Sequence, residues 1–468
     1  MVHTRIARLG LVATLALAGC VTGGDGSSDL RATVAESSTS TLPTTTTSTV
    51  PPTTTSTTTT TTTIPAPREL TIEVEPVAAS LEVTDATGSA YVGPAPFTGP
   101  VAGAVELVVK APGFETETIV LGAEETSVTP WLDKSGQVLD KLLEFDTGPA
   151  PKQVAFRPGH DELWVTLLAG RGFEVYDPAS GRQIAAVDLP KAGSVEVIFN
   201  RTGTRAYISQ METASVYEID AETKEVLRQI STGGVWTKVM VLSPDEQTLW
   251  ASNWVSNDVS EIDLATGEVR RKLSTVRTPR GLFVTPDGAK LYVAGFASGE
   301  LQVFDLATGE GTVLHRTGGA MRHLVGSPDG SIVYGSEMAL DTIVATDTAT
   351  DEVTNLAVVD RLPNTIDVSP DGRLLFVSNR GRNNPETYYR PGPEWGTVVV
   401  LDTATGAYLD AIVGGNQTTG LDVSPDGTLL AFSDFLDDRI VIYRIPGYDQ
   451  LLAGGGGRWE AHAAELVK

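Results

Sequence analysis

The most regular feature of this sequence is a unit of roughly 42 residues in which short apolar stretches alternate with polar turns. The units share a turn of the type Ser-Pro-Asp-Gly, in which proline presets φ, aspartate caps the backbone and glycine takes a left-handed position. Six copies start at Asn200, Ser243, Thr285, Ser327, Ser369 and Ser424, and a degenerate copy starts at Arg157. A second turn marker runs in step with the first, at Asp177, Asp220, Asp263, Asp305, Asp347 and Asp402. Each unit therefore predicts four short strands joined by tight turns.

Four antiparallel strands in every unit are typical of a β-propeller blade, and counting the units predicts seven blades. The last unit, from Thr419 to Gly447, contains only three strands. Residues 135–142 match residues 266–273, the outer strand of the third unit, and so supply the missing strand from the N-terminal side. This pairing closes the ring and removes a free sheet edge. We therefore expect an all-β fold with a seven-bladed propeller over residues 135–447, in which 135–145 completes the last blade.

Segments that follow the turns, Leu249-Trp-Ala-Ser-Asn, Leu291-Tyr-Val-Ala-Gly and Leu375-Phe-Val-Ser-Asn, resemble YVTN-type propeller repeats of the surface-layer type. The resemblance covers about residues 135–447. It implies a propeller, but its members include surface-layer-associated proteins, periplasmic binding propellers and relatives of lactonases. Because one fold hosts many activities, the resemblance leaves the function open.

Residues 68–133 predict a small β-sandwich-like domain, because stretches of β-forming residues such as Leu70–Val74 and Ala104–Lys110 are separated by glycine and proline. The order of strands and turns resembles a PEGA domain, although the Pro-Glu-Gly-Ala signature is absent. An immunoglobulin-like or carboxypeptidase-regulatory-like sandwich is the alternative. In either case the segment carries no catalytic constellation, and we interpret it as a spacer or adhesion module.

Residues 1–19 have the form of a signal peptide, with Arg5 and Arg8 before an apolar run that is too short to span a bilayer. The run ends in Leu17-Ala-Gly-Cys20, which resembles a bacterial lipobox and implies lipidation of Cys20. The alternative is an ordinary signal peptide with a chance cysteine. Residues 20–67 follow as a Thr/Ser/Pro-rich tether with too few apolar side chains to fold. We therefore expect a lipoprotein that is anchored to the membrane outside the cytoplasm, in the bacterial cell envelope.

The amino-acid composition excludes or disfavours several classes of function. A formal charge of −25 argues against a nucleic-acid binder. The single cysteine excludes an intramolecular disulfide framework and a cysteine-cluster metal site. Turn aspartates account for eleven of the acidic residues, so net acidity says little about a ligand. No cofactor or metal site is expected, and we expect a monomer.

A basic ring is the main candidate site. The residues five positions before each turn begin the innermost strands, at one mouth of the channel: Lys152, Val195, Lys238, Arg280, Arg322, Asn364 and Thr419. Four of these seven are cationic, and such a ring would concentrate anions. The alternative is that each cation lies in solvent or pairs with a neighbouring acid.

The loop of the sixth unit is longer than the others and is predicted to overhang the same mouth. It spans residues 380–396 and offers cationic and aromatic side chains: Arg380, Arg382, Arg390, Tyr388, Tyr389 and Trp395. The alternative is that it packs over its own blade. Trp254 and Phe435, in the corresponding loops of blades three and seven, either line the rim or fill gaps between blades.

Catalytic candidates are few. His323 follows Arg322 at the start of an innermost strand, and Glu196 holds the matching position in blade two, so these two are the candidates for a general base. Without a nucleophile or metal partner, His323 is better interpreted as a channel-wall residue, and catalysis is not favoured. Residues 448–468 predict a flexible Gly-rich linker and a short tail.

Three functions stay open. The first is a binding or scaffolding propeller that engages an anionic glycan, a peptide or an envelope protein at its mouth. The second is a lactonase-like hydrolase that uses the channel. The third is a purely structural cell-surface protein. The basic and aromatic mouth favours the first.

Overall fold

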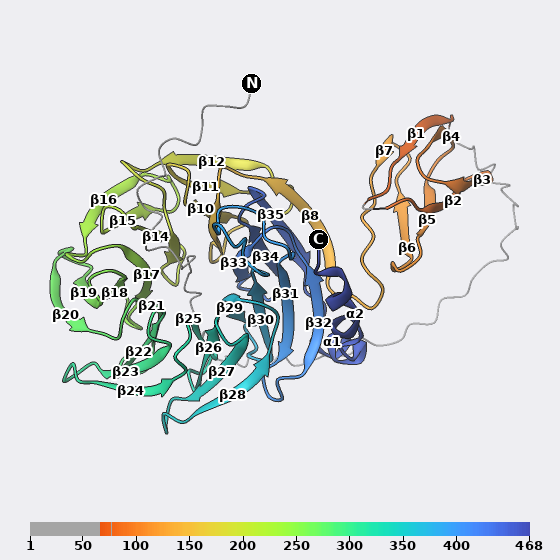
Figure 1. Cartoon of the computed structure of the whole chain (residues 1–468). Coiled ribbons are helices and arrows are strands. Elements are labelled where there is room, and N and C mark those ends of the chain that lie inside the picture. The colour runs from red at the N-terminus through yellow and green to blue at the C-terminus, as the bar shows by residue number, and fades with distance from the viewer. Residues whose placement is uncertain (1–65, 76) are drawn as a thin grey trace, which may run out of the picture. The chain divides into compact units, whose positions relative to one another are not determined.

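The computed structural model describes residues 66–75 and 77–468, which divide after Lys134 into two compact units (Figure 1). Cys20, the leader and the Thr-rich stretch up to residue 65 lie outside the described residues. No helix in the described part of the chain is both long and apolar enough to cross a bilayer.

The smaller unit is a β-sandwich of two sheets. One sheet has the order β4-β1-β7, and the other has the order β3-β2-β5-β6. Their strands are β1 (Arg68–Ile72), β2 (Ser80–Asp85), β3 (Gly88–Pro94), β4 (Phe97–Val101), β5 (Val105–Lys110), β6 (Glu117–Leu121) and β7 (Ser127–Val128). Apolar and polar residues alternate, so that Val105, Leu107 and Val109 enter the core while Glu106 faces solvent.

The larger unit is a β-propeller of seven four-stranded antiparallel sheets, which confirms the predicted all-β fold (Figure 1). Blade one contains β9 (Pro151–Phe156), β10 (Leu163–Leu167), β11 (Gly172–Tyr176) and β12 (Gln183–Asp188). Blade two contains β13 (Glu196–Phe199), β14 (Arg205–Gln210), β15 (Ser215–Asp220) and β16 (Val226–Ser231). Blade three contains β17 (Thr237–Leu242), β18 (Thr248–Asn253), β19 (Asp258–Asp263) and β20 (Val269–Ser274).

The remaining blades repeat this arrangement. Blade four contains β21 (Pro279–Val284), β22 (Lys290–Gly295), β23 (Glu300–Asp305) and β24 (Gly311–Arg316). Blade five contains β25 (Met321–Gly326), β26 (Ile332–Glu337), β27 (Thr342–Asp347) and β28 (Val353–Val358). Blade six contains β29 (Pro363–Val368), β30 (Leu374–Asn379), β31 (Thr397–Asp402) and β32 (Tyr408–Val413). Blade seven contains β33 (Thr418–Val423), β34 (Leu429–Asp434), β35 (Arg439–Arg444) and β8 (Asp140–Asp146).

The ring closes where β8, from the N-terminal side of the propeller, pairs with β35 as the outer strand of blade seven (Figure 1). The pairing is antiparallel, with Phe145 opposite Ile440. The closure predicted from the sequence is confirmed. The buried Asp410 of β32 reinforces it by accepting the backbone N–H groups of Val138 at 2.8 Å and Leu139 at 2.7 Å.

Residues 448–468 form two short helices and a 3₁₀ turn that belong to the propeller unit: α1 (Tyr448–Gly454), α2 (Gly457–His462) and η1 (Ala463–Glu465). Trp459 stacks on Tyr408 of β32 with ring centroids 3.7 Å apart. A β-carbon at Gly456, whose φ is +69°, would lie 2.4 Å from the carbonyl oxygen of Tyr408. The glycine run, which the sequence analysis interprets as a flexible linker, thus serves a left-handed turn and a close approach to blade six.

Hydroxyl groups link adjacent blades near the channel. Ser336 of β26 accepts the N–H of His323 in its own blade at 3.0 Å and donates to the carbonyl of Asn364 in the next blade at 2.8 Å. Equivalent hydroxyl groups donate to the carbonyls of Val195, Lys238, Arg280 and Thr419 from Thr166, Ser209, Ser252 and Ser378. Because these carbonyls belong to the residues that begin the innermost strands, the links set the position of the channel mouth.

The buried carboxyl of Asp410 predicts a pH dependence of stability. Burial raises the pKa of Asp410 from 3.8 to about 6. A folded-state pKa above that of the unfolded chain means that this group contributes its full stability below about pH 4 and loses it as the pH rises through about 6. In Asp410→Asn we expect the melting temperature to fall less than in the wild type between pH 4 and 6.5, measured by thermal unfolding. The melting temperature of the variant still falls with rising pH, because burial also raises the pKa of Asp367 to about 6.

Asp263→Asn is the control for this measurement. A hydrogen bond from the backbone N–H of Thr266 lowers the pKa of this partly exposed turn carboxyl, so its contribution is lost only as the pH falls below about 4. If the melting temperature changed equally with pH above pH 4 in Asp410→Asn and in the wild type, Asp410 would not be the source of this pH dependence.

Candidate functional site

The site at the channel mouth is built from two positions of each blade that lie sixteen residues apart. The first begins the innermost strand, and the second follows the second strand. The seven pairs, in blade order, are Lys152 with Leu168, Val195 with Met211, Lys238 with Trp254, Arg280 with Phe296, Arg322 with Met338, Asn364 with Arg380, and Thr419 with Phe435. Because both positions lie at the same end of every blade, cationic and aromatic side chains meet there.

In blades three to five these side chains alternate around the mouth and form what we term the cation–aromatic arc: Lys238, Trp254, Arg280, Phe296 and Arg322. The ammonium nitrogen of Lys238 lies 4.5 Å from the Trp254 ring centre. The Arg280 guanidinium lies 5.2 Å from the ring centres of both Trp254 and Phe296, and that of Arg322 lies 5.9 Å from Phe296. These distances are those of cation–π contacts, which hold each cation against the face of a ring.

Lys152 makes the same kind of contact on the other side of the ring, because its ammonium nitrogen lies 4.2 Å from the Phe435 ring centre of blade seven. The described structure thus brings all four predicted cations of the basic ring into contact with aromatic side chains. Trp254 and Phe435 are buried between blades and so both pack in the inter-blade gaps and form part of the mouth.

Strained backbone supports the mouth. Trp236, Thr278, Leu362 and Gln417, which precede the innermost strands, all have φ near +60°, a conformation that is rare for residues other than glycine. The carbonyl of each accepts the backbone N–H of the residue at the second mouth position, as Trp236 does from Trp254 at 2.9 Å and Thr278 from Phe296 at 2.9 Å. Such strain is concentrated at functional sites in proteins.

Three buried N–H donors beside the arc have no acceptor among the described residues: Nε1 of Trp254, Nδ2 of Asn364 and Nε2 of His323. The amide oxygen of Asn364 already accepts the Arg322 Nε–H, so its NH₂ group remains as the donor. Nδ1 of His323 accepts the N–H of Ile366 at 3.2 Å, which places the proton of a neutral imidazole on Nε2. Unsatisfied donors in a folded protein call for an explanation, and here they share one end of the channel.

His323 does not have the properties of a general base. Burial, reinforced by Arg322 and Arg280, lowers its pKa to about 3. Its Nδ1 faces the innermost strand of the next blade. Glu196 holds the equivalent register position in blade two, whereas His323 lies in blade five, so the two candidates are three blades apart. The described residues contain no cluster of histidine, cysteine and acidic side chains that could hold a metal ion, and the lowered pKa together with the Ile366 contact favours a channel-wall role for His323.

The predicted binding residues of the long loop between β30 and β31 contact different parts of the structure. Arg380 lies at the mouth, where it donates to the side chain of Gln417 and lies 5.4 Å from the Tyr388 ring centre. Tyr388 and Tyr389 contact each other with ring centres 4.0 Å apart. Arg382 and Arg390 are exposed and form ion pairs within the loop, with Glu394 at 3.1 Å and Glu386 at 2.6 Å.

Trp395 contacts the C-terminal tail. Its backbone N–H donates to the carbonyl of Leu466 at 2.8 Å, and the ammonium nitrogen of Lys468 lies 4.3 Å from its ring centre. Nε2 of His462 lies 2.8 Å from Asp360, in the segment that leads into blade six. The tail therefore holds the long loop against its blade, a contact that the sequence analysis did not anticipate.

Comparison with known proteins agrees with this architecture. Antigen Lp49 from Leptospira interrogans is 34% identical over 359 residues, covering 74% of this chain and 78% of that protein. Residues 209–421 match the YNCE-like β-propeller family. The chain belongs to the YNCE-like β-propeller family. A chain of hydrazine synthase from Kuenenia stuttgartiensis superimposes with a TM-score of 0.55 at 19% identity, covering 64% of this chain and 97% of that chain, which shows a shared fold.

Sequence reasoning about this YNCE-like propeller located the cations but missed Phe296, which completes the arc, and Met338, which packs with Trp254 and Phe296 in one buried cluster. The constant spacing of sixteen residues is the signal that identifies them. No sequence pattern shows that the N–H groups of Trp254 and Asn364 lack an acceptor, because this property follows from tertiary packing.

The tail contact predicts local loss of protection in the loop. We expect deletion of Leu466–Lys468 to accelerate amide exchange in residues 383–395 by about tenfold or more, because the acceptor of the Trp395 N–H is removed. Hydrogen exchange with mass spectrometry measures this. Leu452→Ala, at an exposed position on α1, is the control and should leave the loop protected. Unchanged exchange after the deletion would show that the tail does not hold the loop.

Proposed function

We propose that this YNCE-like propeller is an extracytoplasmic binding protein whose channel mouth holds an anionic, acceptor-rich ligand. The observation that carries the proposal is that three buried N–H donors, from Trp254, Asn364 and His323, have no acceptor among the described residues. These residues lie at, or next to, the register positions that carry the four cations.

Energetics support an acceptor as the missing partner. A buried donor without an acceptor costs about 1–3 kcal/mol, and a ligand oxygen that reaches it recovers this cost. Carboxylate and phosphate groups accept several hydrogen bonds and carry the charge that Lys238 and Arg280 attract. Cation–π contacts hold these two cations in place before a ligand arrives, so less ordering entropy is lost on binding.

The acidic surface adds selectivity. The chain carries a formal charge of −25, which opposes the approach of anions in general, whereas the four cations of the mouth attract them locally. Binding should therefore depend on several donors together, as expected for a specific site.

The location outside the cytoplasm rests on the leader and on the relative. The related protein from Leptospira interrogans is named an antigen. The Leu17-Ala-Gly-Cys20 motif and the Thr-rich stretch are consistent with a lipid anchor and a tether. In this proposal the lipid on Cys20 holds the protein on the outer face of the membrane, and the tether presents the mouth to a cell-wall glycan, a peptide or an envelope protein.

Trp254→Phe tests the mouth most sharply, because it removes one N–H group and keeps an aromatic ring beside Lys238 and Arg280. We expect the dissociation constant for fluorescein-labelled octaglutamate or tetragalacturonate to rise about tenfold, with little loss of stability. Fluorescence anisotropy measures the affinity. Lys238→Gln should weaken binding and reduce its salt dependence.

Trp250→Phe, at a buried position in the core between blades three and four, is the matched control. The proposal fails if the wild type binds neither probe at millimolar concentration, or if Trp254→Phe binds as the wild type does.

A further inference from the structure

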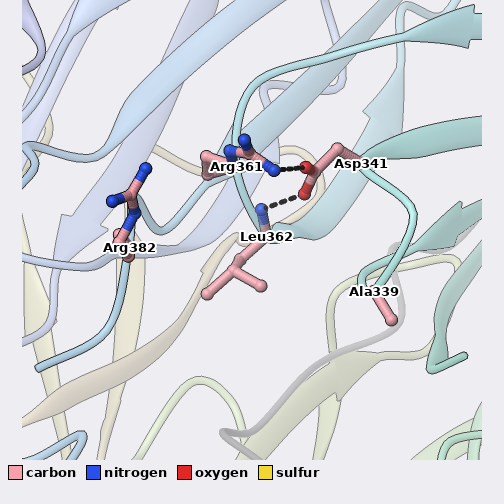
Figure 2. A pocket seen from close by; sticks show the side chains of 5 residues that line it. All are labelled: Ala339, Asp341, Arg361, Leu362 and Arg382. Atoms are coloured by element: carbon pink, nitrogen blue, oxygen red, sulfur yellow. Dashed lines mark hydrogen bonds and ion pairs between the residues drawn. The ribbon is translucent and has the colours of Figure 1, made fainter. Parts of the chain in front are cut away.

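An open hollow of about 350 Å³ lies beside the mouth, at the junction of blades five and six. It is lined by Ala339, Asp341, Arg361, Leu362 and Arg382 (Figure 2). These residues come from three segments: the loop after β26, the segment before β29 and the long loop after β30. The loop after β26 and the long loop begin with the mouth residues Met338 and Arg380, and the segment before β29 leads directly to Asn364, so the hollow is adjacent to the site already described.

Two exposed arginine side chains flank the hollow, and each is held by a partly buried acid. Arg361 pairs with Asp341 at 2.7 Å, and Arg382 pairs with Glu394 at 3.1 Å. In Figure 2 Arg382 lies on one side of the hollow and the Arg361–Asp341 pair lies on the other. Both arginine side chains are 61% exposed, whereas the side chains of Asp341 and Glu394 are 15% and 13% exposed.

The acids are fixed by the backbone. Asp341 accepts the N–H of Leu362 at 2.9 Å, and Glu394 accepts the N–H of Arg382 at 2.9 Å. Each acid thereby orients an arginine, whose fork of five N–H donors it satisfies only in part. Because the two ion pairs are neutral overall, the hollow offers directed hydrogen bonds more than net charge.

The floor of the hollow is apolar and continuous with the arc. Leu362 packs against the buried cluster of Trp254, Phe296 and Met338. Leu340, which lies between Ala339 and Asp341 in the sequence, is 51% exposed. An apolar floor between two oriented guanidinium groups favours a peptide over a sugar, because a peptide carries an apolar side chain next to carbonyl and carboxylate oxygens.

We propose that the hollow binds an apolar side chain of an acidic peptide segment from a partner protein, with adjacent carboxylate or carbonyl oxygens on Arg361 and Arg382. The inference rests on the proposed function, since further acidic side chains of the same peptide enter the mouth at the cation–aromatic arc. The hollow thus selects peptides in which apolar residues alternate with acidic ones.

Fluorescence anisotropy on the full-length protein tests this with two labelled octapeptides, one of alternating glutamate and leucine and one of glutamate alone, and with tetragalacturonate. The wild type should bind the alternating peptide at least tenfold more tightly than octaglutamate. In the double variant Arg361→Gln/Arg382→Gln this preference should be lost, while the affinity for octaglutamate should change less than threefold. Arg316→Gln is the matched control, because Arg316 is 68% exposed and ion-paired to Glu300 on an outer strand pair.

Each outcome decides between the two proposals. If Trp254→Phe weakens peptide binding and the double variant does not, the peptide subsite is wrong while the mouth survives. If tetragalacturonate binds more tightly than the alternating peptide, the hollow does not select a peptide. If neither the mouth nor the rim variant changes any affinity, both proposals fail. Thermal unfolding of the double variant checks that the exposed substitutions leave the fold intact.

Discussion

The mouth of this propeller depends on a hydrogen bond between a side-chain hydroxyl and the backbone of the next blade. Ser336 and its equivalents each join the second strand of one blade to the start of the neighbouring innermost strand. The hydroxyl that links two blades therefore also positions a mouth residue. Ser209 donates to the carbonyl of Lys238, and Ser252 donates to the carbonyl of Arg280. The geometry of the site and the stability of the ring therefore share the same contacts.

This shared geometry brings together groups that single blades do not offer. Arg280 of blade four lies between the rings of Trp254 and Phe296, from blades three and four, and Lys152 of blade one meets Phe435 of blade seven. The cations collect at the same end, while the turn aspartates supply eleven of the 59 acidic residues of the chain. The proposed function rests on this contrast between an acidic chain and a mouth that carries four cations.

The sequence was sufficient for the architecture, because turn chemistry repeats in every blade and the strand at residues 135–145 matches an outer strand. It also placed the four cations, since residues at one register position must lie at one end. It did not show that Trp395 contacts the tail or that the glycine run of the tail packs against Tyr408, because these contacts join segments without a repeat. The hollow at Arg361 was missed for the same reason: three loops from two blades build it, and no single loop carries its pattern.

A ligand site at the mouth is tested most directly by the NMR signal of the Trp254 indole N–H, observed in protein with ¹⁵N-labelled tryptophan. Trp164 is an internal control, because its N–H already donates to Glu162 at 2.9 Å. As octaglutamate is added, we expect the Trp254 signal to move downfield because its N–H gains an acceptor, while the Trp164 signal stays in place. A Trp254 signal that does not move when the peptide saturates the protein would contradict a ligand site at this mouth.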